Sequence, residues 1–185
     1  MAAERAHLLD LHNDTAINVV GLLKGPVGTA RRYGLRLDRF PLAADVAAVD
    51  MLGETRLTRL RDGIMAAVEV AGTVELECVR CLRAYAQPFV AEFAEEYRPT
   101  VDVRTGAGLD EVAVLDDDAV AATIDENHEL DLGEVLRQEI LVALPMRPDC
   151  GEDCPGPESL LGAPPAAPRD ERFAALERLL EDESA

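Results

Sequence analysis

Two short pairs of cysteines constrain this chain more than any other feature of its sequence. Cys78 and Cys81 are separated by two residues in E-C-V-R-C-L, Cys150 and Cys154 by three in D-C-G-E-D-C, and there is no other cysteine. A structural zinc ion takes four soft ligands in a tetrahedron, and two close pairs brought together by the fold supply them. The pattern therefore predicts one four-cysteine zinc site. Two other interpretations stay open: reduced thiols without a metal, and a pair that cycles between dithiol and disulfide.

The charge of the chain is strongly negative but unevenly distributed. The net charge is −18, whereas residues 24–83 hold ten basic and eight acidic residues, so the rest of the chain carries −20. Such a field attracts a basic protein partner and repels the phosphate backbone of RNA. We therefore expect a protein partner, with any contact to RNA indirect; the alternative is that the negative charge only keeps the protein soluble.

An alternative use of the near-neutral stretch is direct binding of RNA or of a partner by its arginines. If these side chains gather on one face, they can contact phosphates despite the overall charge. The alternative, which we favour, is that these arginines pair with the surplus carboxylates of the chain. The candidate contact residues in this segment, 31–61, are Arg31, Arg32, Arg36, Arg56 and Arg59.

Nothing in the sequence predicts a membrane protein. No run of eighteen apolar residues exists, and the first residues lack a basic region followed by an apolar stretch and a cleavage site. We therefore expect a cytoplasmic protein, in which reduced thiols are the usual state.

The fold class predicted from the periodicity is α+β. Alternating or apolar runs at 55–60, 64–70, 74–78 and 89–97 indicate an antiparallel β-meander or a small barrel-like sheet, with R-D-G at 61–63 as a hairpin turn. A helix is expected to begin after Asp131, which caps it together with Glu134, and to end at Pro145. Its apolar stripe comprises Leu132, Val135, Leu136, Ile140 and Ala143.

The remaining segments give the expected organisation of the chain. Residues 1–15 are expected to be a flexible lead-in, and 16–154 a single α+β domain with an acidic loop near 102–120 and a C-terminal cysteine loop. Residues 155–168 are rich in proline and read as a linker. Residues 169–185 are expected to form a short terminal helix and a tail.

No set of residues typical of catalysis is visible. The two serines, Ser159 and Ser184, both lie near the C-terminal end, and the three histidines stand in polar segments. The run Asp116–Asp118 is typical of a solvated loop rather than of a cation site. We therefore expect no enzymatic activity.

Four stretches, taken in order, resemble the YceD-type large-ribosomal-RNA-subunit accumulation protein family. They are I-N-V-V-G-L-L-K-G-P-V-G-T-A-R-R-Y at 17–33, V-E-L-E-C-V-R-C-L at 74–82, the segment 128–154 that ends in C-G-E-D-C, and D-E-R-F-A-A-L-E-R-L-L at 170–180. The four cysteines match the cysteine positions of that family. Many relatives continue with a further C-x2-C, where this chain reads G-P-E-S-L-L-G.

The resemblance implies a process rather than a reaction. The family is needed for normal accumulation of large-subunit ribosomal RNA in bacteria and plastids. Together with the missing catalytic set and the negative charge outside residues 24–83, the resemblance leads us to expect a non-enzymatic factor in ribosome biogenesis whose partner is a ribosomal protein or a pre-ribosomal particle. The alternatives are an RNA-binding module that uses the arginines of segment 31–61, and a thiol redox switch.

Overall fold

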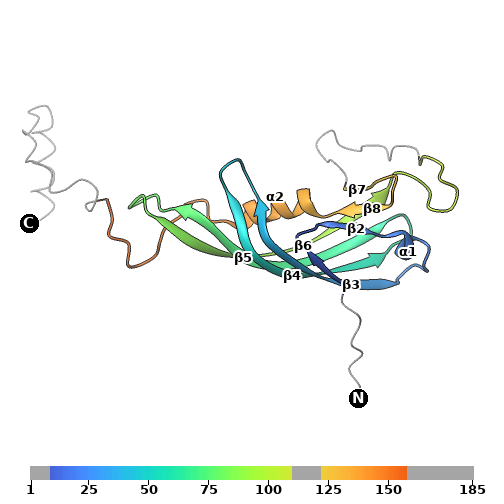
Figure 1. The fold of residues 1–185 in the computed structure, drawn as a ribbon, viewed down its shortest axis with the longest axis horizontal. Helices are drawn as coiled ribbons and strands as arrows, with labels where there is room; N and C mark the ends of the chain where they lie inside the picture. The colour runs from blue at the N-terminus through green and yellow to red at the C-terminus, as the bar shows by residue number, and fades with distance from the viewer. Residues whose placement is uncertain (1–8, 110–121, 158–185) are drawn as a thin grey trace, which may run out of the picture.

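One curved sheet of eight strands dominates the computed structural model, which describes residues 9–109 and 122–157. The order across the sheet is β1-β3-β4-β5-β6-β7-β8-β2 (Figure 1). The strands are β1 Leu9–His12, β2 Ala16–Asn18, β3 Ala30–Pro41, β4 Ala47–Arg59, β5 Ile64–Glu77, β6 Ala84–Pro99, β7 Thr123–Ile124 and β8 Glu129–Asp131. The helices of the described part are α1 Val20–Leu23 and α2 Gly133–Ala143.

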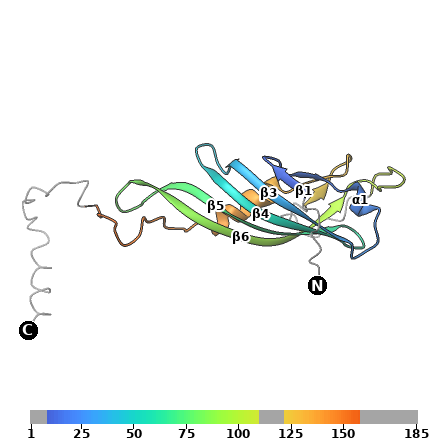
Figure 2. The same cartoon turned by 60° about the horizontal axis from the view of Figure 1, so that its bottom comes forward.

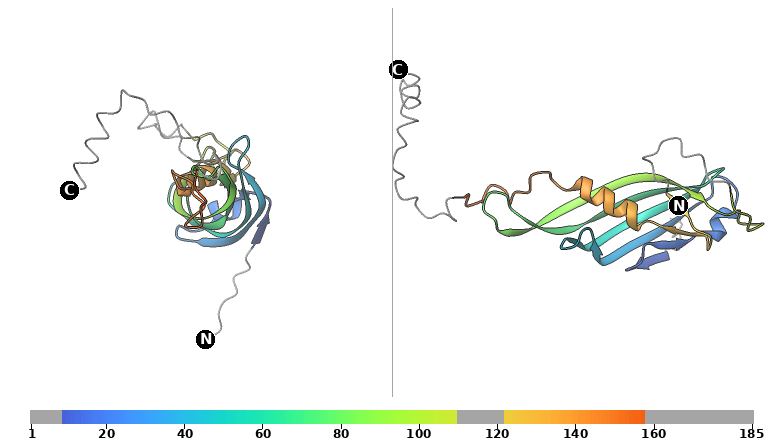
Figure 3. Two further views of the ribbon diagram at one scale, coloured as in Figure 1. Left: turned by 90° about the vertical axis from the view of Figure 1, so that its left-hand side faces the viewer. Right: turned by 90° about the horizontal axis from the view of Figure 1, so that it is seen from above.

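The predicted α+β class is wrong. Half of the described residues lie in strands and 11% in helices, and the sheet curls into a half-barrel (Figure 3). The reason is the length of the four central strands, which lie side by side as an antiparallel meander (Figure 2). They have 12, 13, 14 and 16 residues, far more than the short runs that the periodicity indicated.

Two of these strands differ from the prediction for identifiable reasons. No strand was expected at β3, although Tyr33, Leu35 and Leu37 occupy alternate positions and are buried, because Gly34 is buried between the first two and obscures the alternation. The runs 64–70 and 74–78 form one strand, β5, because Gly72 does not end it. A Cβ at Gly72 would lie 2.9 Å from the Met51 Cγ, so this glycine permits close packing inside the sheet.

The predicted hairpin is confirmed, and so is the apolar stripe of α2 except at its last member, Ala143, which is exposed. The Leu60 N–H donates to the Gly63 carbonyl at 2.9 Å, which closes the β4–β5 turn. On α2, Leu136 and Ile140 are fully buried, as is Leu132 directly before the helix. The helix lies along one face of the sheet beside β6 (Figure 1), so its apolar stripe completes the core.

The start of α2 differs in detail from the predicted capping box. Asp131 Oδ1 accepts the Gly133 N–H at 2.8 Å and the Thr15 hydroxyl at 2.7 Å. Glu134 instead bonds Arg137 and Gln138, one turn further along the helix. Asp131 therefore connects the helix start to the segment before β2 rather than to Glu134.

The expected segments at the ends of the domain are described only in part. Leu9–His12, inside the expected lead-in, form β1, which pairs in parallel with β3. Residues 110–121 of the acidic loop region, most of the expected linker and the expected terminal helix lie outside the described residues. Neither described helix is long and apolar enough to cross a membrane.

Candidate metal centre

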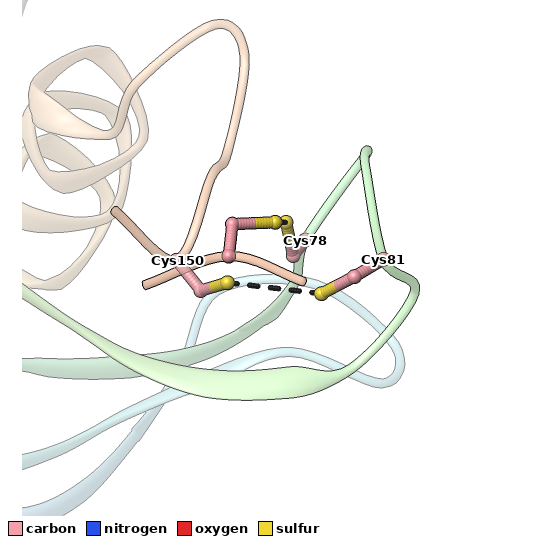
Figure 4. Close-up of side chains that lie close together, drawn as sticks. Cys78, Cys81 and Cys150 are labelled. Carbon is pink, nitrogen blue, oxygen red and sulfur yellow. Dashed lines mark hydrogen bonds between the residues drawn. The ribbon is translucent and has the colours of Figure 1, made fainter. Parts of the chain in front are cut away.

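The four cysteines meet at one point of the fold. Their Sγ atoms all lie within 4.8 Å of one another. Cys81 and Cys150 are 3.7 Å apart and Cys78 and Cys154 are 3.8 Å apart, measured between Sγ atoms (Figure 4). A tetrahedron with metal–sulfur bonds of about 2.3 Å has sulfur–sulfur edges of about 3.8 Å. The cluster could therefore hold a metal ion, and the thiols are unpaired rather than joined in disulfides.

The first pair lies in the tight connection between β5 and β6. The Cys78 N–H donates to the Arg83 carbonyl at 2.9 Å, and the Leu82 N–H donates to the Cys78 carbonyl at 2.8 Å. Leu82 has a φ of 55°, a left-handed conformation that side chains other than glycine rarely adopt. This turn brings Cys78 and Cys81 to the same side, where both are fully buried.

The second pair comes from the segment that follows α2. Its backbone is joined to the first pair by the Val79 N–H, which donates to the Pro148 carbonyl at 3.0 Å. Gly151, directly after Cys150, has a φ of 91°, and its N–H donates to Asp149 Oδ1 at 2.8 Å. The chain reverses here, so the Cys154 N–H reaches the Gly151 carbonyl at 3.2 Å.

The pKa values of two thiols in the cluster are shifted in opposite directions. Burial opposes ionisation of Cys78, but backbone N–H groups of Arg80, Cys81 and Cys150 outweigh it and lower the pKa of this thiol to about 6. The pKa of Cys150 is raised, first by its hydrogen bond with Cys154 and then by burial. A bound cation would lower the pKa of all four thiols, including Cys150, because its positive charge stabilises the thiolates.

Three of the five candidate arginines share the outer face of the sheet, opposite the buried one. Arg32 and Arg56 are cross-strand partners on β3 and β4, and Arg36 lies further along the same face of β3. A carboxylate already contacts one of them, because Arg32 Nη1 lies 3.4 Å from Glu54 Oε1.

The other two candidate arginines lie elsewhere. The Arg31 guanidinium lies over α1, where its Nη2 is 3.0 Å from the position that a Cβ on Gly21 would take. Arg59, at the end of β4, donates from Nη1 to the Gly63 carbonyl at 2.8 Å. The structure therefore brings Arg32 and Arg56 together, places Arg36 four residues away on the same face, and separates all three from Arg31 and Arg59.

A row of carboxylates on the outer face did not emerge from the sequence. Glu54 on β4, Glu69 on β5 and Glu92 on β6 are directly opposite one another in the strand register. Like charges in such positions repel and destabilise a sheet. They line a groove of about 410 Å³. The alternation of each strand predicts that its own glutamate faces outward. It does not predict that the three align, because that depends on the register between strands.

Comparison with known families agrees with the resemblance noted above. The sequence model of the family described as "Large ribosomal RNA subunit accumulation protein YceD" matches residues 66–180, more than half of the chain. The chain belongs to the YceD family. The matched part contains all four cysteines and α2, whereas the five candidate arginines of this YceD protein precede it. No curated protein and no solved structure matches the chain.

Proposed function

We propose that this YceD-family protein is a non-catalytic factor that supports accumulation of large-subunit ribosomal RNA through a protein partner. In this account a zinc ion bound by Cys78, Cys81, Cys150 and Cys154 stabilises the fold. The observation that carries the proposal is the near-tetrahedral spacing of the four Sγ atoms within a chain of this family.

A structural role for the zinc follows from the number of ligands. Four protein thiolates fill a tetrahedral shell and leave no position for water or substrate, which a catalytic zinc requires. The ion would instead join the β5–β6 turn to the segment after α2, two parts of the chain that are distant in sequence. The protein would thus resemble structural zinc modules, in which metal binding contributes directly to folding.

The proposed partner is a basic ribosomal protein or a pre-ribosomal particle that presents one. The carboxylates of Glu54, Glu69 and Glu92 along the outer groove, and the net charge of −18, favour a lysine- or arginine-rich segment there. Arg32 already contacts Glu54, and Arg56 lines the same groove. The repulsion that a basic side chain of the partner would relieve is therefore mainly that between Glu69 and Glu92. The same field opposes a long phosphate backbone, so contact with ribosomal RNA would be mainly indirect.

The function is tested in cells that lack the chain. The ratio of large- to small-subunit ribosomal RNA should fall, wild-type protein should restore it, and Cys81→Ser should not. An unchanged ratio in the deletion strain would refute the proposed function.

The partner surface is tested separately with purified components. At low salt, immobilised wild-type protein should retain large-subunit ribosomal proteins, and a Glu69→Gln/Glu92→Gln variant should retain less. The matched control, Glu126→Gln/Glu129→Gln, removes two exposed charges around the β7–β8 turn and should behave as wild type. Equal retention by both variants would exclude the groove as the binding surface.

A further inference from the structure

A second cavity lies at the other end of the long strands from the cysteines. It measures about 420 Å³ and is bordered by the β4–β5 turn, the end of β6, and α1. The strand β5 spans the length of the sheet (Figure 1). It runs from this turn to Cys78, so its 14 residues separate the cavity from the metal centre. The apolar part of the lining comes from Leu23, Pro99, Val101, Val103 and Leu109.

Three arginines from separate segments line this cavity: Arg59 at the end of β4, Arg61 in the hairpin turn, and Arg98 near the end of β6. Gly63 holds the turn against β6, because a Cβ there would lie 2.3 Å from the Tyr97 carbonyl oxygen. No other residue type fits this contact without a backbone shift. The packing of the turn on β6 therefore places Arg61 and Arg98 in the lining of one cavity.

The hydrogen-bonding capacity of these arginines is only partly used within the described residues. Arg59 Nε is buried without a hydrogen-bond partner there, although its Nη1 bonds the Gly63 carbonyl. The Arg61 side chain forms no ion pair or hydrogen bond with any described residue. Arg98 uses its Nε for Glu96 at 3.2 Å, which leaves its other guanidinium nitrogens for a ligand.

Two carboxylates also border the cavity, and neither forms an ion pair with these arginines. Asp102 is occupied by its own turn, since its Oδ1 accepts the N–H groups of Arg104 and Thr105 and the Thr105 hydroxyl. Asp62 is the second carboxylate. The cavity thus concentrates three guanidinium groups against an apolar wall, which strengthens their attraction for an anion.

We propose that this cavity binds a phosphate group, either of a small phosphorylated molecule or of a single RNA strand. Guanidinium groups are planar forks that match phosphate oxygens, and they stay charged at any physiological pH. The donors available to a phosphate are the guanidinium nitrogens of Arg61, which have no partner among the described residues, and those of Arg98 that Glu96 does not use. The site is independent of the proposed function, because it uses neither the cysteines nor the outer groove.

The test uses the full chain with three probes. Inorganic phosphate and adenosine monophosphate are titrated by isothermal calorimetry, and a fluorescent single-stranded RNA of about ten nucleotides is followed by anisotropy. The pocket variant is Arg61→Gln/Arg98→Gln. The matched control, Arg39→Gln/Arg147→Gln, removes the same charge from two exposed positions that line neither the cavity nor the outer groove. Circular dichroism checks that both are folded, and Arg61→Gln alone, in an exposed turn, serves if the double variant is not.

At least one probe should bind the wild type, the pocket variant should lose about tenfold or more in affinity, and the control should bind as wild type. Binding of the small probes identifies a phosphorylated small molecule as the source, and binding of the RNA alone identifies a strand. The proposal is overturned if no probe binds, or if both variants weaken binding equally. Neither failure would alter the retention of ribosomal proteins by the outer groove, so the two proposals fail separately.

Discussion

Removal of metal from the four cysteines should lower the free energy of unfolding by at least about 4 kcal/mol. The thiol pairs Cys78–Cys154 and Cys81–Cys150 lie 76 and 69 residues apart in the sequence. A cross-link that closes a loop of this length restricts the unfolded chain by about 4 kcal/mol. This value is a lower bound, because it omits the coordination bonds themselves, and structural zinc contributes on the order of 10–16 kcal/mol in small peptides.

Thermal unfolding followed by circular dichroism measures this effect. In a domain of this size each kcal/mol moves the midpoint by about 2–4 °C, so a strong chelator should lower it by roughly 8–16 °C. The matched control is Cys81→Ser, whose midpoint should be low from the start and insensitive to chelator. A wild-type midpoint that moves by less than about 2 °C after complete chelation would refute the cross-link argument.

Three further substitutions test the fold, each against the wild type in urea or acid unfolding. Ile140→Ala empties a fully buried site on α2 and should cost about 2–5 kcal/mol, whereas Val142→Ala, 80% exposed on the same helix, should change stability by less than about 0.5 kcal/mol. Gly53→Ala would place a Cβ 2.3 Å from a β5 carbonyl oxygen and should cost about 1–3 kcal/mol or more, whereas Gly108→Ala, with open space around it, should be neutral or slightly stabilising. The pKa of Asp125 is lowered by the backbone N–H of Glu129, which donates to its carboxylate. The stability that this carboxylate contributes is therefore present near neutral pH and is lost as the pH falls through the lowered pKa. Asp125→Asn should be less stable than wild type at pH 7, and the difference should close on acidification. Equal effects within either pair, or an acid-independent difference for Asp125→Asn, would contradict the corresponding contact.

The parts that sequence reasoning predicted are those set by local spacing. The two cysteine pairs, the hairpin at 61–63 and the apolar stripe of α2 each depend on residues close together in the chain. The α+β prediction was wrong because a short alternating run indicates that a strand exists but not how far it extends. The alternation within β3 and on either side of Gly72 belongs to strands of 12 and 14 residues.

The remaining features depend on which residues face one another across strands, which periodicity does not encode. The parallel pairing of β1 with β3 and the row Glu54, Glu69 and Glu92 follow from the register of the sheet. The arginine cavity depends on the contact of Gly63 with β6, and Arg98 joins it from a segment 37 residues further along the chain than Arg61. The sequence alone could single out arginines but not which of them converge.

The most direct test of the central claim is the zinc content of protein purified without chelator, measured by elemental analysis in wild type and in Cys81→Ser. The account predicts close to one zinc ion per chain in the wild type, loss of that zinc in the variant, and native cysteines that a thiol reagent reaches only after chelation. A metal-free wild type whose cysteines react at once would contradict the claim that these four residues form a structural zinc centre.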